Sequence, residues 1–224
     1  MILSVHQPQY LPWLGYFDKI KNSDAFVFLD NVQYKKREFQ NRNRIRTREG
    51  SMWLTVPVIS KDRFYQKISE VLTNGDTDWA KEHLKSIECN YSKSEFFHNY
   101  ITVLRDIYSK RWEKLIDINL EFINLFLKTF EIKTPVYFES TLSVETTSSQ
   151  RIIDICRKMK ADTYLSGQGA REYMDENLFK DNNIKVIYQD FKHPQYKQQF
   201  EGFESHLSVL DYLLNNGPKL WQQQ

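Results

Sequence analysis

The sequence is poor in the features that mark secreted, membrane-spanning and disulfide-stabilised proteins. Its 224 residues include only two cysteines, Cys89 and Cys156, which lie far apart in the chain. We expect both to be buried, reduced thiols, because neither has a second Cys or a His at the spacing of a metal site. No apolar run approaches the roughly 20 residues of a membrane-spanning helix, and the N-terminus lacks the charged start and apolar core of a signal peptide. These absences predict a cytoplasmic protein with no membrane span, whose two cysteines neither form a disulfide nor bind a metal.

An excess of charge of either sign is also missing. The chain has 31 Lys and Arg against 29 Asp and Glu, and its formal net charge is +2 at pH 7. The molecule as a whole therefore does not attract nucleic acid, and any anion binding must come from a local patch. Aromatic residues, in contrast, are abundant at 15%, and several stand in polar contexts where packing in a core alone would not place them.

Short apolar runs separated by helical patterns predict the fold class. Residues 2–5 and 25–29 have the length of buried strands, and residues 15–20 between them read as a short helix. Further strands are predicted at 66–72, 136–138, 163–165 and 184–188, with helices at 149–160 and 171–180. This alternation predicts an α/β protein with a doubly wound, mostly parallel sheet. We expect a single domain over residues 1–224, with a helical segment at 76–130 inside it.

A basic stretch at residues 35–48 stands out against the balanced total charge. Four arginines, from Arg42 to Arg48, are spaced by two, so an extended strand would point all four to one face. Gly50 makes a turn, and the returning strand completes a β-hairpin over residues 40–58. Such a face is either a solvated edge that discourages strand pairing or a site for phosphate or carboxylate, which suits the planar guanidinium group. In the second case Arg42, Asn43 and Arg44 would bind the ligand.

Chemistry is expected where strands end, because ligands bind beyond the carboxyl ends of the strands in doubly wound sheets. His6 and Asp30 follow the first two strands, and Gln7 follows His6. Histidine has an unperturbed pKa of about 6.5 and suits general-base chemistry. The alternative is that His6 locks the proline-rich loop by hydrogen bonds. His193 is a second candidate base, because His-Pro-Gln-Tyr at residues 193–196 is similar to His-Gln-Pro-Gln-Tyr at residues 6–10.

A glycine loop, Ser166-Gly167-Gln168-Gly169, lies between a predicted strand and a predicted helix. Glycines there let backbone N–H groups approach an anion closely, at the positive end of the helix dipole. The alternative is a tight turn that needs left-handed backbone angles. Tyr173 follows the loop and is taken with it as ligand-binding. The candidates for stacking on a sugar or a base are Tyr10, Trp13 and Tyr196.

Six segments carry a resemblance to a known family. In order they are HQPQYLPWLGYFDKI, FLDNVQYKKREFQNRNRIR, WLTVPV, YLSGQGAREYMD, HPQYKQQF and LSVLDYLLNNG, and they run from residue 5 to about residue 217. Together they resemble the WbqC-like family. The resemblance implies a bacterial protein linked to the biosynthesis of O-antigen lipopolysaccharide and other surface polysaccharides, with glycine transfer to the sugar as its activity.

The first strand, loop, helix and strand also resemble the start of nucleotidyl-transfer enzymes of the HIGH type, such as pantothenate synthetase, and so a HUP-like fold. Those enzymes carry HxGH at the helix start. The matching residues here are Trp13-Leu14-Gly15-Tyr16, so both histidines are absent and only the glycine matches. The comparison implies that an adenylate would activate the transferred carboxyl group, with ATP and Mg²⁺ as cofactors.

The leading hypothesis is a transferase that moves an aminoacyl (glycyl) or acyl group to an amino sugar on a nucleotide or lipid carrier. Its catalytic residues would be His6, Asp30 and His193. The arginine strand and the loop of Ser166, Gly167 and Gly169 would hold the nucleotide-sugar or another phosphorylated small molecule. Two alternatives stay open: a nucleic-acid or RNA-binding module that uses the arginine strand, which the balanced net charge disfavours, and a non-catalytic scaffold in a polysaccharide cluster.

Overall fold

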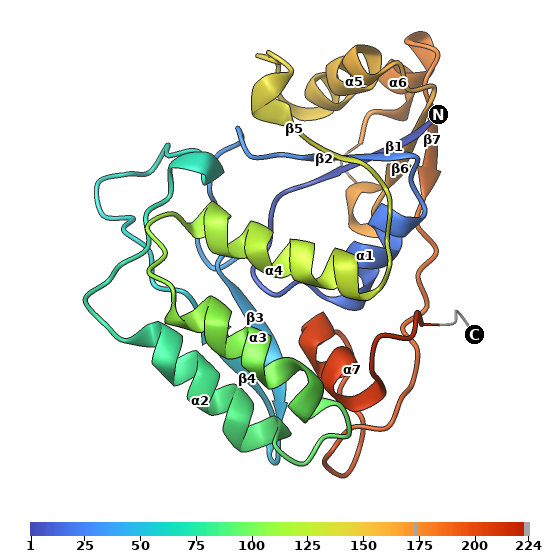
Figure 1. The fold of residues 1–224 in the computed structure, drawn as a ribbon. Helices are drawn as coiled ribbons and strands as arrows, with labels where there is room; N and C mark the ends of the chain where they lie inside the picture. Colours follow the sequence, from blue (N-terminus) through green and yellow to red (C-terminus); the bar gives the residue numbers. More distant parts are fainter. Residues whose placement is uncertain (173, 222–224) are drawn as a thin grey trace. The chain divides into compact units, whose positions relative to one another are not determined.

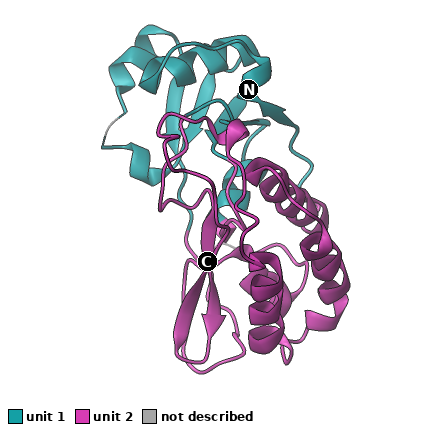
Figure 2. Cartoon of the chain, turned by 90° about the vertical axis from the view of Figure 1, so that its left-hand side faces the viewer, with its two compact units in different colours: residues 1–7, 15–32, 132–191 teal, residues 8–14, 33–131, 192–224 magenta. Residues whose placement is uncertain are grey.

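Figure 1 shows a mixed α/β chain, taken from a computed structural model that describes residues 1–172 and 174–221. The chain forms two compact units, each built from segments that are distant in the sequence (Figure 2). Unit 1 comprises Met1–Gln7, Gly15–Val32 and Ile132–Phe191, and unit 2 comprises Pro8–Leu14, Gln33–Glu131 and Lys192–Gln224.

The centre of unit 1 is a parallel sheet of five strands. The strands are β1 (Ile2–His6), β2 (Ala25–Phe28), β5 (Val136–Phe138), β6 (Thr163–Ser166) and β7 (Lys185–Tyr188). Their order across the sheet is β5-β2-β1-β6-β7, and every neighbouring pair is parallel. The predicted α/β class with a mostly parallel central sheet is therefore confirmed. The chain first builds outward from β1 to β2 and β5 and then returns to β6 and β7 on the other side, so the strand order reverses between β1 and β6.

Helices cover the apolar faces of this sheet (Figure 1). They are α1 (Leu14–Lys21), α5 (Ser148–Met159) and α6 (Glu176–Asp181). Val5 of β1 belongs to a buried cluster with Ile153 of α5 and Phe179 of α6. On the opposite face, Phe26 of β2 packs edge-on against Tyr16 of α1, with ring centroids 5.7 Å apart. Because a strand alternates its side chains, β2 contributes to both faces of the sheet, with Val27 in the buried cluster and Phe26 against α1.

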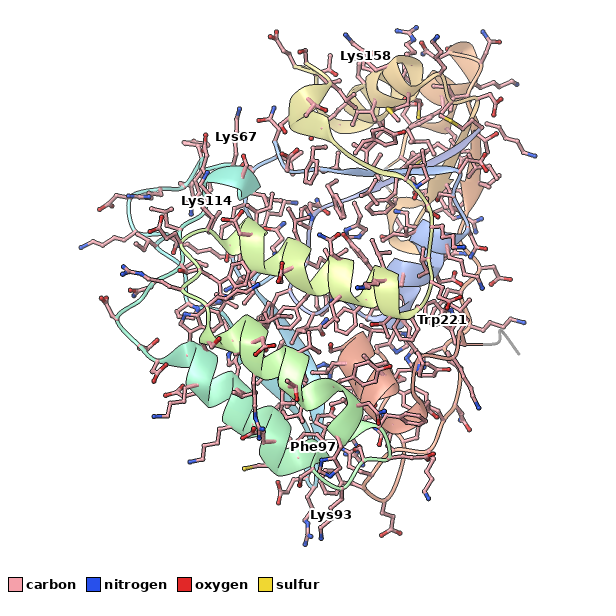
Figure 3. All side chains as sticks on the ribbon, in the orientation of Figure 1. Lys67, Lys93, Phe97, Lys114, Lys158 and Trp221 are labelled. Atoms are coloured by element: carbon pink, nitrogen blue, oxygen red, sulfur yellow. The ribbon has the colours of Figure 1, made fainter. Side chains whose placement is uncertain are left out.

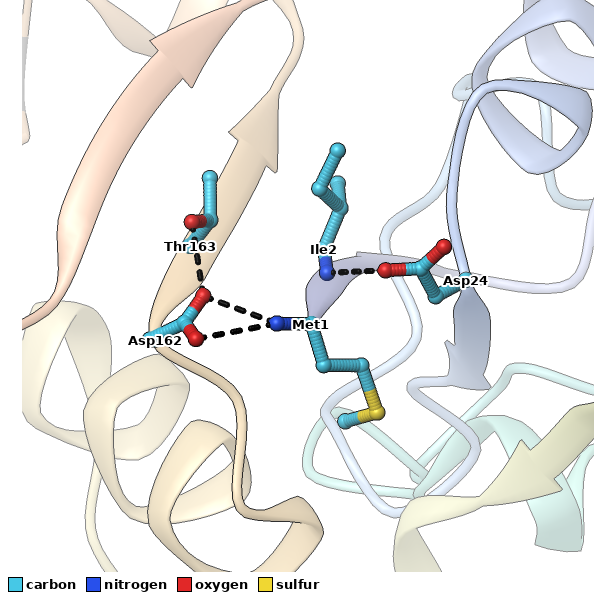
Figure 4. A network of polar contacts seen from close by, with 5 residues as sticks. All are labelled: Met1, Ile2, Asp24, Asp162 and Thr163. Carbon is cyan, nitrogen blue, oxygen red and sulfur yellow. Dashed lines mark hydrogen bonds and ion pairs between the residues drawn. The ribbon is translucent and has the colours of Figure 1, made fainter.

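The amino ends of the strands are tied together by polar contacts (Figure 4). The Met1 amino group donates to Asp162 Oδ1 at 2.9 Å, and the Ile2 N–H donates to Asp24 Oδ2 at 2.7 Å. The Thr163 hydroxyl donates to Asp162 Oδ1 at 2.8 Å. Asp162 precedes β6 and Asp24 precedes β2. Their hydrogen bonds hold the start of β1 between these two neighbouring strands, at the edge of the sheet opposite the carboxyl ends.

Unit 2 combines helices with a β-hairpin. Its helices are α2 (Trp79–Tyr91), α3 (Phe97–Ser109), α4 (Leu115–Thr129) and α7 (Val209–Asn216), and its strands are β3 (Arg42–Thr47) and β4 (Gly50–Thr55). β3 and β4 pair antiparallel, and the turn between them places Gly50 at a φ of +129°. At the start of α3, Phe97 is buried while Lys93, just before it, is exposed and points outward (Figure 3). Lys93 lies in the short connection between α2 and α3, whereas Phe97 lies on the buried face of the amphipathic helix α3.

The strand predicted at residues 66–72 is wrong. That segment holds a 3-10 turn, Ile68–Glu70, in which the Glu70 carboxylate accepts a hydrogen bond from the Lys67 N–H at 3.0 Å. Ile68 and Val71 are both fully buried, and a spacing of three brings their side chains to one side of such a turn. Lys67 itself is exposed (Figure 3). The two other 3-10 turns among the described residues are Glu139–Thr141 and Gln168–Ala170.

Candidate functional site

A cavity of about 590 Å³ opens in unit 1 at the carboxyl ends of β1 and β6. This is the point at which the strand order reverses, and ligands of parallel α/β sheets bind there because the diverging connections leave a crevice. Its polar lining is His6, Gln7, Lys19, Ser148, Ser149, Ser166, Gly167 and Gly169. Its apolar lining is Val5, Leu29, Ile152, Tyr164, Ala170, Met174 and Phe179. A volume of this size suits a small organic ligand.

His6 is the last residue of β1, and the fold keeps its ring neutral. Its Nδ1 lies 3.2 Å from the Gln7 carbonyl oxygen. A carbonyl only accepts, so this contact places the proton on Nδ1 and leaves Nε2 as the hydrogen-bond acceptor. Burial and the positive charge of Lys19 lower the pKa of His6 to about 3, against a smaller opposing effect of the Gln7 contact. At neutral pH the side chain therefore carries no charge, and its Nε2 can accept a hydrogen bond.

Lys19 is the cation of the cavity. Its residue is only 5% exposed, and its Nζ donates to the Val5 carbonyl oxygen at 2.9 Å. Burial lowers the pKa of Lys19 to about 8, so the ammonium form still predominates at pH 7. Lys19 is not among the residues predicted from the sequence to form the site. The available signal is that Lys19 stands between Phe17 and Ile20 on the buried side of α1, where an apolar side chain is the usual choice.

The glycine loop lines the cavity with open backbone. Neither Gly167 nor Gly169 has a positive φ, so the tight-turn explanation does not hold at these positions. A Cβ added to either glycine would meet nothing within 4 Å, so both face open space. The Gln168 side chain anchors the loop by donating to the Gln189 carbonyl oxygen at 2.8 Å.

The helix predicted at residues 171–180 is shorter, because α6 begins only at Glu176. The glycine loop therefore does not run directly into a helix N-terminus. The helix that starts at the cavity is α5, whose first residues Ser148 and Ser149 both belong to the lining. The backbone N–H groups of a first helical turn lack partners within the helix and favour negative charge.

The described lining of the cavity contains basic residues but no acidic ones. Its described residues include one lysine and one histidine but no aspartate or glutamate. Together with the start of α5, this gives a polar end that favours an anion. The apolar lining residues, among them Val5, Tyr164 and Phe179, offer surface for an uncharged part of a ligand such as a flat ring. The cavity thus matches an amphipathic, negatively charged small molecule.

A second cluster of polar and aromatic groups lies in unit 2, on the hairpin face formed by Phe39, Arg42, Arg44 and Trp53. The guanidinium carbons of Arg42 and Arg44 lie 4.3 Å and 5.6 Å from the centroid of the Trp53 ring. Trp53 and Phe39 are 42% and 40% exposed, and their centroids are 5.9 Å apart. No ion pair joins either arginine to a carboxylate of the described chain. We call this surface the Arg–Trp face.

The expectation that four arginines share this face is wrong for two of them. Arg46 is 4% exposed and donates to the carbonyl oxygens of Thr47 and Gly50 at 3.0 Å and 2.7 Å. It also donates to the Glu201 carbonyl oxygen at 2.5 Å, so it holds the hairpin in place. Arg48 lies in the turn beyond the end of β3.

Comparison with known proteins identifies the family of the chain. The WbqC-like protein family matches residues 7–223. The chain belongs to the WbqC-like protein family. It is similar to the uncharacterized protein Rv1507c of Mycobacterium tuberculosis (strain ATCC 25618 / H37Rv), with 38% identity over 217 residues, 96% of this chain and 94% of that protein. No solved structure matches it.

None of the other predicted residues of this WbqC-like chain is among the described residues that line the cavity. Asp30 is in unit 1 and buried, and its Oδ1 accepts the Ser140 N–H at 2.9 Å. Tyr173 falls outside the described residues. The structure thus brings together five predicted residues, namely His6, Gln7, Ser166, Gly167 and Gly169.

Several predicted ligand-binding residues of unit 2 make internal contacts. Tyr10 is fully buried, and its hydroxyl lies 2.9 Å from His83 Nδ1. Asn43 donates to the Leu11 carbonyl oxygen at 2.7 Å. Such contacts account for these residues as parts of the packing, without a ligand.

His193, Trp13 and Tyr196 belong to one aromatic cluster of unit 2. The His193 ring centroid lies 5.1 Å from that of His206 and 6.1 Å from that of Tyr196. Trp13 stacks on His206 at 5.2 Å. The Tyr196 hydroxyl donates to the buried carboxylate of Asp211 at 2.7 Å.

The cysteines follow the prediction only in part. Cys156 is buried, and burial raises the pKa of its thiol to about 12, whereas Cys89 on α2 is exposed, so the prediction of a buried thiol is wrong there. In residues 1–172 and 174–221 no three His, Cys, Asp or Glu side chains gather as a metal site would require. No helix within the same ranges is long and apolar enough to cross a membrane.

Proposed function

We propose that this protein is a transferase of bacterial surface-polysaccharide biosynthesis, including that of O-antigen. It binds a phosphorylated small molecule, a nucleotide or a nucleotide-linked amino sugar, in the cavity of unit 1. There it transfers an aminoacyl group such as glycyl, or another acyl group, to the sugar amine. The observation that carries this proposal is the cavity at the reversal of strand order, with a cation, a neutral histidine, open glycine backbone and no carboxylate in its described lining.

The residues suggest how such a reaction would proceed. The sugar amine attacks the carbonyl carbon of an activated acyl group, an acyl phosphate or an adenylate. A new C–N bond forms, and the phosphate or nucleotide leaves with the electron pair of the broken C–O bond. His6 Nε2 accepts a hydrogen bond from the amine and then its proton. Burial is the larger cause of the low pKa of His6, and the positive charge of Lys19 is the second. An anionic ligand beside Lys19 offsets this second effect, so ligand binding raises the pKa of His6 and makes it a better base.

The strand order supports a nucleotide as part of the ligand, because doubly wound sheets of this order bind nucleotides at the reversal point. It also favours a HUP-like fold and the adenylate route, in which ATP and Mg²⁺ would activate the carboxyl group. The two HIGH-type histidines are missing, so in this route Lys19 takes the place of a cationic group near the phosphates.

A thermal-shift screen with nucleotides and nucleotide-linked amino sugars tests the proposal. A ligand at about 100 times its Kd adds about 2.7 kcal/mol, which raises the midpoint by about 5–10 °C for a chain of this size. The glycylated or acylated sugar is then sought by mass spectrometry with wild-type protein and with His6→Gln. Midpoints unchanged by every nucleotide and nucleotide sugar would contradict the proposal.

The Arg–Trp face favours a second candidate function, the binding of single-stranded RNA. Exposed aromatic rings stack on bases at about 1–3 kcal/mol per base, and arginines beside them attract phosphates. Fluorescence anisotropy with labelled RNA tests this candidate. Trp53→Ala should weaken binding by about 5- to 150-fold, whereas Tyr65→Ala, which removes an 82% exposed ring elsewhere, should leave it unchanged. Binding that is absent, or that Trp53→Ala does not alter, would rule the candidate out.

A further inference from the structure

Lys19 carries a buried positive charge that no carboxylate of residues 1–172 and 174–221 pairs with. An ammonium group has three N–H donors, and among the described residues its Nζ donates one hydrogen bond, to the Val5 carbonyl oxygen at 2.9 Å. No ion pair joins it to a carboxylate of the described residues. Asp18, its neighbour on α1, instead accepts a hydrogen bond from Gln189 Nε2 at 2.8 Å.

Such an arrangement costs free energy in the empty protein, since buried charges are normally paired. Lys19 also lines the cavity, so an anion can reach it from outside. The missing counter-charge is therefore expected on a ligand and not on another part of the chain.

The surroundings of Lys19 favour a phosphoryl group over other anions. Gly167 and Gly169 leave room for the close approach of tetrahedral oxygens, and α5 begins at the same cavity with Ser148 and Ser149. An ammonium is a compact point charge that suits phosphate. We propose that Lys19 is the residue that holds a phosphoryl group of the ligand in the cavity of unit 1. This inference rests on the proposed function and adds the residue and the chemical group that decide binding.

Binding of a phosphoryl group through Lys19 should depend on pH in a distinctive way. Among the described residues, the titratable groups that line the cavity with Lys19 are His6 of β1 and Tyr164 of β6, and the charged groups beside it on α1 are Asp18 and the exposed Lys21. Burial lowers the pKa of Lys19 to about 8, so raising the pH from 7 to 9.5 reduces its protonated fraction by about 30-fold. Inorganic pyrophosphate becomes more negative over the same range, so without a titrating cation its binding would strengthen.

Calorimetric titration with inorganic pyrophosphate tests the inference. At pH 7, Lys19→Met should weaken binding by about 10- to 150-fold, the loss of one hydrogen bond to a charged group. The matched control Lys21→Met removes an exposed lysine of the same helix and should bind like wild type. Wild-type affinity should itself fall by up to about 30-fold at pH 9.5. This measurement needs no variant, so it decides the question even if Lys19→Met does not fold.

The outcomes separate this inference from the proposed function. If Lys19→Met binds pyrophosphate as tightly as wild type, or if wild-type binding strengthens at pH 9.5, Lys19 does not hold the phosphoryl group. Nucleotide sugars that still raise the melting midpoint of both proteins equally would then keep the proposed function and overturn only the role of Lys19. If pyrophosphate does not bind wild type while nucleotide sugars do, the inference is likewise overturned.

Discussion

Replacing the buried Lys19 by methionine should stabilise the ligand-free protein near neutral pH. The pKa of Lys19 falls from an ordinary 10.5 to about 8 in the folded chain, and this difference corresponds to about 3 kcal/mol of free energy that opposes folding. Methionine has a similar length and no charge. It loses the hydrogen bond to Val5, which is worth about 1 kcal/mol. The net expectation is a gain of about 2 kcal/mol at pH 7.

The sign of the pH dependence follows from the two protonation states. Below pH 8 lysine is protonated in both the folded and the unfolded chain, so the full cost is present. Between pH 8 and 10.5 the unfolded chain binds more protons at Lys19 than the folded chain, so the stability of wild type rises with pH. The advantage of Lys19→Met should therefore be largest at pH 7 and shrink steadily as the pH approaches 10.

Urea unfolding followed by tryptophan fluorescence at pH 7, 8, 9 and 10 measures this difference. Lys21→Met serves as the control, because Lys21 is exposed and its replacement should change stability by less than about 0.5 kcal/mol. A Lys19→Met protein that is less stable than wild type at pH 7, with a difference that does not vary with pH, would refute the reasoning. Lys19 would then stabilise the fold through Val5, and no anion would be needed to complete its site.

Three further predictions concern other parts of the chain. Wild type should lose stability relative to His6→Gln as the pH falls from 6.5 toward 3, because the unfolded chain binds a proton at His6 that the folded chain excludes; urea midpoints at pH 7 and 4.5 that move in parallel would contradict this. Gly217→Ala should cost about 2–4 kcal/mol, because Gly217 has a φ of +75° and the new Cβ would lie 2.6 Å from the Phe96 ring. Gly75→Ala, where a Cβ meets nothing within 4 Å, is its control, and equal thermal midpoints for the two variants would be the contrary result. Asp211→Asn should destabilise by about 1–3 kcal/mol in urea unfolding, because the buried carboxylate accepts bonds from two tyrosines and a glutamine; an unchanged midpoint would show that these bonds are not needed.

The glycine loop shows what a local sequence pattern can predict and what it cannot. The pattern predicts the end of the strand but not which helix begins beside it. A strand followed by glycines is a local pattern, and it predicts Ser166 and Gly167 at the carboxyl end of a strand, where β6 ends in the structure. The helix expected right after the loop instead begins at Glu176, and the helix start at the cavity belongs to α5. α5 is near in space but far in sequence from β1, so only the strand order could identify it.

What the sequence by itself determined is the class of the sheet, the position of β1 and the candidacy of His6, because these depend on apolar runs and on a histidine directly after one of them. The tertiary structure alone decided that Lys19 shares the cavity with His6, that Arg46 is a structural residue, and that Tyr10 is buried. Each of these depends on which distant segment covers a side chain. Burial sets the pKa of Lys19 and of His6, and burial is a property of the packed molecule that no local pattern of residues contains.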